Sequence, residues 1–233
     1  NALTQDFFDK TEVIRRQAAA AVKDHFTVAD YRAVLRMGGL SDDAIKEIKA
    51  ILDFFLYGDP FLLLMVSCLQ SALSGKRLPG KPWAHLLPHY IHPTRTFRVP
   101  LVEMTGAPPN VQAVYGEIQK TTGLPFVPSD YRALGRWPRF LEIAWEDWKK
   151  KIATAAYQRE VRQLNELALA LAEDLPFAVA MNTQVLRKAG FTPSQIADIV
   201  ATVDLFQGLL PGLITNVAAF KIGLEGGSHP PAR

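Results

Sequence analysis

Two aspartates stand in sequence contexts that could support acid–base chemistry. Asp130 follows a proline in the stretch VPSDYRALGRWPRF, and Asp59 lies in the stretch YGDP. A carboxylate can take a proton from a bound water when it lies within about 3 Å of that water. Both positions also have a plain structural explanation. An acid in the first turn stabilises a helix, and an aspartate beside glycine and proline commonly forms a turn.

The other residue types that carry chemistry form weaker patterns. Cys68 is the only cysteine, which excludes an internal disulfide, a dithiol centre and a peroxide-reducing enzyme. His85, His89 and His92 have a spacing that would suit a metal on a continuous helix, but Pro88 interrupts the segment and no acid or cysteine stands nearby. We therefore do not expect a metal site.

Composition describes an ordinary globular chain with enough apolar residues for a full core. The 233 residues are 48% hydrophobic and 21% charged, with a formal charge of +3. Basic residues are scattered among acids, so nucleic acid is not an expected partner. The most apolar window, residues 61–69, is shorter than the roughly 20 residues of a membrane span. We expect no membrane association, a cytoplasmic location that suits a free cysteine, and further residues before Asn1, which is not a methionine.

Apolar residues recur at helical spacing along most of the chain, and no strand alternation is visible. Capping residues stand before amphipathic runs at Thr27, Ser41 and Thr192. Between residues 111 and 150 the pattern predicts a helix, a short loop and a second helix, with Asp130 in the first turn of the second. The sequence therefore predicts an all-α fold.

An internal repeat organises the chain. Residues 35–75 align without a gap with residues 186–226 at an offset of 151, and the match includes glycine, proline and aspartate as well as apolar types. We interpret the two segments as copies of one helical unit that form a pseudo-dimer about a twofold axis. The predicted division is a first repeat over residues 1–80, a proline-rich linker over 81–110, a second repeat over 111–226 and a flexible tail over 227–233.

Two segments together resemble the group I α-2-haloacid dehalogenases: YGDPFLLLMVSCLQSAL, residues 57–73, and PFVPSDYRALGRWPRFLEIAW, residues 125–145. The resemblance implies an all-helical fold of two tandem repeats, related to the alkylhydroperoxidase-like fold, with the active site between the repeats. It implies hydrolysis of 2-haloalkanoic acids by a water that displaces halide directly, with inversion and without an enzyme ester, a metal or a cofactor.

The resemblance also assigns roles to residues. The activating aspartate of the family lies in a Ser-Asp-aromatic motif ahead of a Trp-Pro pair, which here is Ser129, Asp130 and Tyr131 followed by Trp137 and Pro138. Asp130 would then be the base, and Ser129 would contact the substrate.

The second holder of the water departs from the family pattern. The family has an asparagine in a Tyr-Gly-Asn-Pro segment, and this chain has Asp59 there. If Asp59 and Asp130 share one water, carboxylates about 5 Å apart repel by about 3 kcal/mol at an effective dielectric near 20, so one of them would hold a proton. The expected lining of the substrate pocket is Leu62, in place of a family tyrosine, with Phe206, Leu209, Leu210 and Leu213.

Two function hypotheses follow. The first is cofactor-independent hydrolytic dehalogenation of short 2-haloalkanoic acids. The second, suggested by Asp59, is a catalytically silent helical protein of the same fold that binds or senses a small molecule. The expected partner is a short halogenated carboxylic acid, and the assembly that we consider is a homodimer.

Overall fold

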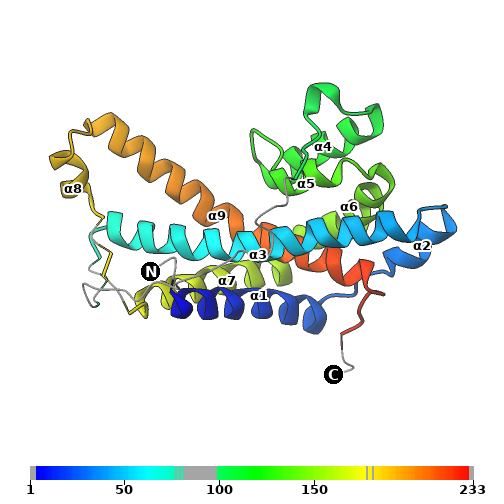
Figure 1. Ribbon diagram of the computed structural model, residues 1–233, viewed down its shortest axis with the longest axis horizontal. Coiled ribbons are helices and arrows are strands. Elements are labelled where there is room, and N and C mark those ends of the chain that lie inside the picture. The colour runs from blue at the N-terminus through cyan, green and yellow to red at the C-terminus, as the bar shows by residue number, and fades with distance from the viewer. Residues whose placement is uncertain are drawn as a thin grey trace. The chain divides into compact units, whose positions relative to one another are not determined.

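Helices form the framework of the computed structural model, which describes residues 4–76, 78, 80, 99–176, 178, 179 and 181–230. These residues contain no β-strand, and the prediction of an all-α fold is confirmed. In chain order the elements are α1 (Gln5–His25), α2 (Tyr31–Met37), α3 (Asp42–Leu73), the 3₁₀ turn η1 (Met104–Gly106), α4 (Pro109–Thr122), α5 (Ser129–Leu134), α6 (Pro138–Ile152), α7 (Ala155–Glu173), α8 (Thr183–Lys188) and α9 (Pro193–Leu224) (Figure 1).

The two long helices begin at the predicted caps. The backbone N–H of Ala44 donates to Ser41 Oγ at 3.2 Å at the start of α3. At the start of α9, Gln195 N donates to Thr192 Oγ1 at 3.3 Å, while Gln195 Oε1 accepts from Thr192 N at 2.9 Å. This reciprocal pair gives hydrogen-bond acceptors to the backbone N–H groups of Thr192 and Gln195, which no carbonyl of the helix can reach.

The predicted cap at Thr27 is wrong. The N-cap of α2 is Asp30, whose carboxylate accepts from Ala33 N at 3.1 Å. The helix starts later because Val28 is extended and exchanges two backbone hydrogen bonds of 2.9 Å with Ser228. The first residues of the tail that we expected to be flexible are therefore paired with the chain before α2.

The helix bounds repeat at the offset found in the sequence. α3 and α9 are both 32 residues long, Pro193 follows Asp42 by 151 residues, and each helix contains an internal proline, Pro60 or Pro211. The glycines that precede these helices share a left-handed backbone, with φ of 82° at Gly39 and 93° at Gly190. The twofold axis of a pseudo-dimer stays a prediction.

Contacts divide the chain into two compact units, each built from three segments. Unit 1 comprises Asn1–Gln17, Tyr57–Pro93 and Val161–Ile214, and unit 2 comprises Ala18–Leu56, Thr94–Glu160 and Thr215–Arg233. Four helices, α1, α3, α7 and α9, have residues in both units. The division into 1–80, 81–110, 111–226 and 227–233 stays a prediction, and the histidines at 85, 89 and 92 lie outside the described residues.

Aromatic side chains fill the core of unit 2. Contacts place α6 against α2, α4 and α5. The ring of Tyr131 on α5 lies edge-on to Trp145 at 5.7 Å and to Phe220 at 6.2 Å between centroids. The largest side chains without exposed surface are Trp145, Trp148, Tyr31, Tyr115, Tyr131, Phe140 and Phe220.

A carboxylate of α6 holds the start of α2. Asp147 accepts hydrogen bonds from the hydroxyl of Tyr31 at 2.8 Å, the backbone N–H of Ala29 at 3.2 Å and the ammonium of Lys151 at 2.5 Å. Burial raises the pKa of Asp147, but these hydrogen bonds outweigh it, so the net pKa lies below the usual value.

Unit 1 has an apolar cluster and a buried polar link. The apolar cluster consists of four buried residues, Leu73, Leu186, Ile196 and Val203. Four partly buried residues pack against it: Val66, Leu69, Ile199 and Val200. Gln207 on α9 donates to Asn165 on α7 at 2.5 Å and to Ser67 on α3 at 3.0 Å. Because all three helices meet at this one amide, their register in unit 1 is fixed by hydrogen bonds as well as by apolar packing.

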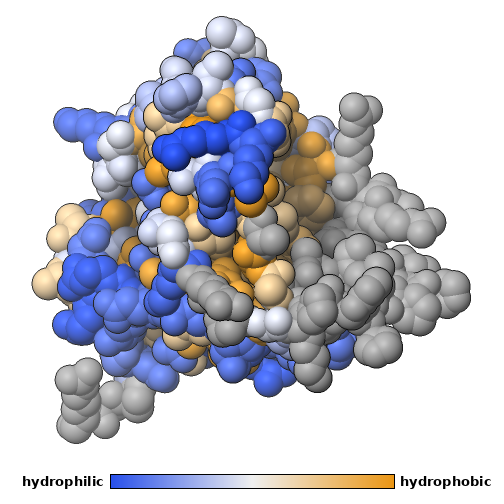
Figure 2. Space-filling view, turned by 90° about the vertical axis from the view of Figure 1, so that its left-hand side faces the viewer, coloured by the Kyte–Doolittle hydropathy of each residue, from blue (hydrophilic) through white to orange (hydrophobic). Residues whose placement is uncertain are grey.

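Two helices, α3 and α9, are long and apolar enough to cross a membrane by length and composition alone. In the most apolar 18-residue window of each helix, the buried share is 56% for α3 and 33% for α9. Core helices of soluble proteins pass the same test, so this is weak evidence for a span. On the face drawn in Figure 2, hydrophilic residues alternate with exposed apolar patches.

Candidate active site

Asp130 lies in the first turn of α5 and is only 2% exposed. Pro128, with φ −55° and ψ 151°, leads into the helix, and Ser129 at the first helical position is exposed. The free N–H groups of a first turn favour a carboxylate, which fits the structural role as well as the catalytic one. A capping aspartate is ordinarily exposed, however, and an aspartate is rarely buried to this extent.

The single helix that we expected from about residue 128 to 150 is two helices, so this prediction is wrong. α5 ends at Leu134, and α6 begins at Pro138 after Trp137, whose backbone (φ −124°, ψ 75°) is not helical. Proline has no N–H and its ring clashes with the preceding turn, so it is favoured in the first turn of a helix and is costly inside one. With six residues, α5 is too short to be stable without tertiary contacts.

The segment before α4 supplies some of these contacts. The backbone N–H of Val102 donates to the carbonyl of Arg132 at 3.0 Å, and the Arg132 guanidinium donates to Glu103 at 2.7 Å. The hydroxyl of Tyr115 lies 3.2 Å from the carbonyl of Val102 and 3.4 Å from that of Arg132. Burial raises the pKa of Tyr115 to about 12, which keeps this donor protonated. The backbone two residues after Asp130 is thereby fixed.

Asn216 of α9 anchors α5 at a second point. Its side-chain nitrogen donates to the hydroxyl oxygen of Tyr131 at 2.8 Å, and the residue is 3% exposed. Our sequence reasoning missed Asn216. The available signal was a lone amide in the apolar run LITNVAAF, because a buried amide requires hydrogen-bond partners.

The other predicted site residues belong to unit 1. Asp59 lies on α3 directly before Pro60 and is 5% exposed, while Leu62 is 44% exposed. On α9 the predicted lining divides by exposure: Leu210 and Leu213 are buried, Leu209 is half-buried and Phe206 is exposed. The structure thus places two predicted residues on α3, four on α9 and, in unit 2, Ser129 and Asp130 on α5. Their roles stay predictions.

Comparisons with known proteins identify the family of the chain. A family model described as "Halocarboxylic acid dehydrogenase DehI" matches residues 1–131. The chain is 33% identical over 224 residues to the (R)-2-haloacid dehalogenase of Pseudomonas putida, with 95% of this chain and 74% of that protein covered. The chain belongs to the group I haloacid dehalogenase family. This confirms the resemblance found in residues 57–73 and 125–145.

Further relatives of this haloacid dehalogenase agree in fold and class. The configuration-inverting 2-haloacid dehalogenase of Pseudomonas sp. (strain 113) is 25% identical over 212 residues, with 87% of this chain and 68% of that protein covered. A solved complex of a D-2-haloacid dehalogenase with L-LA matches with a TM-score of 0.88 at 33% identity, covering 95% of this chain and 77% of that one. The chain is therefore a hydrolase of the 2-haloacid dehalogenase class, and the prediction of an enzyme is confirmed.

The cysteine of this haloacid dehalogenase is not activated. Cys68 on α3 is buried, and burial raises the pKa of its thiol to about 11. A nucleophilic cysteine needs a lowered pKa and some exposure. Cys68 thus packs as a small apolar residue, which agrees with the exclusion of thiol chemistry.

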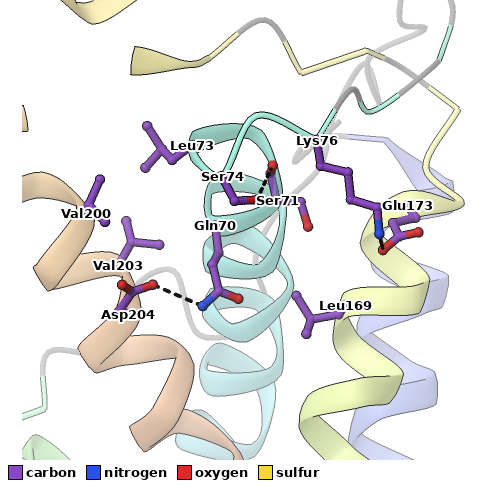
Figure 3. A pocket seen from close by; sticks show the side chains of 10 residues that line it. All are labelled: Gln70, Ser71, Leu73, Ser74, Lys76, Leu169, Glu173, Val200, Val203 and Asp204. Atoms are coloured by element: carbon purple, nitrogen blue, oxygen red, sulfur yellow. Dashed lines mark hydrogen bonds and ion pairs between the residues drawn. The ribbon is translucent and has the colours of Figure 1, made fainter.

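A hollow of about 380 Å³ in unit 1 of the haloacid dehalogenase contains none of the predicted site residues. α3, α7 and α9 line it, and its charged and amide groups pair with each other: Lys76 with Glu173, and Gln70 with Asp204 (Figure 3). Its apolar walls come from Leu73, Leu169, Val200 and Val203. Because its acids are already paired at an open surface, this hollow offers no base for activating water.

Proposed function

We propose that this haloacid dehalogenase hydrolyses short 2-haloalkanoic acids, with Asp130 as the base that activates water. The observation that carries the proposal is the burial of Asp130 at the centre of the family motif, on a short helix that Val102 and Asn216 hold by hydrogen bonds. A buried carboxylate on a firmly held helix can be positioned as a general base requires.

The proposed reaction is one displacement. The water oxygen forms a bond to the α-carbon as the carbon–halogen bond breaks, and the halide leaves with the bonding electron pair. The water proton passes to the carboxylate of Asp130, which then returns it to solvent. The attack from the side opposite the halogen inverts the α-carbon, and no covalent enzyme intermediate forms.

We propose (R)-2-haloacids as the preferred substrates. The relative from Pseudomonas putida is named an (R)-2-haloacid dehalogenase, and the relative from Pseudomonas sp. (strain 113) is named configuration-inverting. The expected conversion is therefore of an (R)-2-haloacid to the (S)-2-hydroxy acid. Chiral chromatography of the product from each separate enantiomer of 2-chloropropionic acid measures both the preference and the inversion.

The remaining residues have proposed roles in the same reaction. Asp59 stands where the family has the asparagine that helps to hold the water, and Ser129 contacts the substrate. The apolar side chains exclude water from the site that the departing halide occupies. These side chains are Leu62, Phe206, Leu209, Leu210 and Leu213.

Release of halide from a panel of 2-haloacids tests the proposed activity. Chloride or bromide is measured by ion chromatography with 2-chloropropionic, 2-bromopropionic and chloroacetic acids, and 3-chloropropionic acid is the control without an α-halogen. We expect release from the first three acids alone. Absence of release from every acid would favour the silent binding protein.

One turnover in ¹⁸O-labelled water tests the direct attack. With enzyme in excess over substrate, water attack places the label in the new hydroxyl group during the first turnover. An unlabelled hydroxyl group would indicate an aspartyl ester whose oxygen came from the enzyme.

Location and assembly are separate proposals. We propose a cytoplasmic enzyme, because its cysteine forms no disulfide, and a homodimer. Cell fractionation checks the first, and light scattering of the purified protein checks the second.

A further inference from the structure

A buried polar network surrounds Asn216 in unit 2. The side-chain amide of Asn216 contacts three helices: Tyr131 on α5 at 2.8 Å, Trp148 on α6 at 2.6 Å and Tyr157 on α7 at 2.7 Å. None of the four side chains is more than 3% exposed. A polar group at this depth must be satisfied inside the protein, so the network is under strong geometric constraint.

The chemistry of the partners fixes the orientation of the amide. The indole N–H of Trp148 can only donate, so the atom of Asn216 that faces it must be the oxygen. The hydroxyl of Tyr157 lies at the same oxygen, and because burial raises the pKa of Tyr157 above its usual range, this hydroxyl keeps its proton and donates it. Two donors occupy both lone pairs of the oxygen.

The nitrogen of Asn216 must therefore face Tyr131. It donates to the hydroxyl oxygen of Tyr131, which leaves the hydroxyl proton of Tyr131 directed away from Asn216. Tyr131 is the residue next to Asp130 in a helix of six residues, and the neighbouring Arg132 is held from the other side by Val102. The direction of the Asp130 carboxylate thus depends on where Tyr131 is held.

We propose that Asn216 is a positioning residue for the dehalogenation reaction, and that it acts through Tyr131 on Asp130. This rests on the proposed role of Asp130 as the base. A displacement of about 1 Å at a catalytic group can lower a rate by about a hundredfold, whereas substrate affinity depends on other contacts. Loss of the hydrogen bond between Asn216 and Tyr131 should therefore lower kcat and leave KM nearly unchanged.

Tyr131→Phe removes this hydrogen bond with the least disturbance, because it keeps the buried ring and deletes only the hydroxyl group. We expect kcat to fall by about 10- to 100-fold with KM within about threefold of the wild-type value. Asn216→Ala should lower kcat at least as much. Asn216→Ala leaves three buried partners without their hydrogen bonds to this residue, so Tyr131→Phe is the decisive variant if Asn216→Ala does not fold.

Tyr157→Phe is the matched control. It also deletes one tyrosine hydroxyl bonded to Asn216, but Tyr157 is on α7 and does not touch α5 through this bond. We expect a loss of stability similar to that of Tyr131→Phe and a kcat within about twofold of wild type. The contrast separates positioning from general stability, which urea denaturation of all three variants measures.

Two outcomes overturn the inference. A wild-type kcat in Tyr131→Phe would show that the hydrogen bond does not position the base. An equal loss of kcat in Tyr157→Phe and Tyr131→Phe would show that the network has a general structural role. Asp130→Asn distinguishes the failure of this inference from that of the proposed function. If Asp130→Asn retains activity, the base assignment itself is wrong, and if it is inactive while Tyr131→Phe is fully active, only the positioning role fails.

Discussion

The hydroxyl group of Tyr115 occupies the space in which a β-carbon at residue 135 would lie. Gly135 has right-handed helical dihedral angles (φ −57°, ψ −17°), so the requirement for glycine is steric and not conformational. This close approach joins α4 to the end of the helix that carries Asp130. A substitution at Gly135 therefore tests how firmly that helix must be held.

Gly135→Ala should destabilise the protein by about 1–3 kcal/mol, the usual range for overpacking in a dense core. Its kcat should fall as well, because α5 must shift to admit the methyl group. Tyr115→Phe removes the obstructing oxygen, so the double variant should be more stable than the sum of the single effects by about 1 kcal/mol or more. Urea denaturation of all four proteins measures this coupling.

Gly116→Ala supplies the control in the same unit. Gly116 is inside α4, and nothing lies within 4 Å of an added β-carbon. Alanine there should raise stability by about 0.5–1 kcal/mol through helix propensity. A loss of stability in Gly116→Ala equal to that in Gly135→Ala would mean that the contact with Tyr115 is not the cause.

Asp130→Asn should lower kcat by a factor of about 10² to 10⁴, the range that a general base contributes. The variant keeps the size of the side chain and replaces one acceptor oxygen with a donor NH2 group, so circular dichroism and the urea midpoint should remain close to wild type. Halide release with saturating substrate gives kcat. Activity at the wild-type level would show that another residue is the base.

Asp59→Asn restores the family residue and removes a negative charge from a position that is 5% exposed. If this carboxylate and Asp130 hold one water, activity should decline as pH rises through the upper apparent pKa of the pair. The substitution should then extend activity to higher pH and lower KM for an anionic haloacid, since repulsion of the substrate is removed. Profiles of kcat and kcat/KM from about pH 5 to 10 measure both effects. Unchanged profiles would exclude the shared water.

Asp147→Asn should cost about 1–2 kcal/mol at pH 7, because Asp147 accepts from Tyr31, Ala29 and Lys151. The folded pKa of Asp147 lies below the unfolded value near 4. Its contribution is therefore present above about pH 4 and is lost as pH falls through the lower folded pKa. The stability difference between wild type and variant should narrow below pH 4. Asp43→Asn, which breaks an exposed pair with Lys46, should have little effect at either pH.

Cys68 should react slowly with thiol reagents in the native protein. With a pKa of about 11, roughly one thiol in a thousand is ionised at pH 8, and the side chain is buried. Labelling with DTNB should be slow in buffer and fast in guanidinium chloride, with one thiol per chain. In a Cys68→Ala background, Ser194→Cys at an exposed site on α9 should label rapidly in buffer.

The helices were predictable from the sequence where local contacts define them. Ser41 and Thr192 cap their helices through hydrogen bonds to residues three positions away, so the signal and the structure lie in the same stretch. Thr27 failed as a cap because a residue 200 positions later, Ser228, pairs with its neighbour Val28. No local pattern contains that information.

The candidate site follows the same rule. The motif around Asp130 indicated the family, since a motif is a property of adjacent residues, and the role of Asp130 as the base stays a prediction. The contacts that hold α5 could not be predicted from the motif, because they come from segments outside it. These contacts are made by Val102, Tyr115 and Asn216. The division of residues 128–150 into two helices was visible at Pro138, whose meaning we missed.

The interleaving of the two units has a consequence for synthesis on the ribosome. Unit 1 needs residues from both ends of its span, 1–17 and 161–214, and unit 2 needs segments from 18–56 to 215–233. Neither can be completed when half of the chain has emerged, in contrast to proteins whose domains fold one after another during translation. The apolar residues of α3 that pack against α9 stay exposed until α9 has been synthesised. We therefore expect that truncation before residue 214 yields no folded fragment.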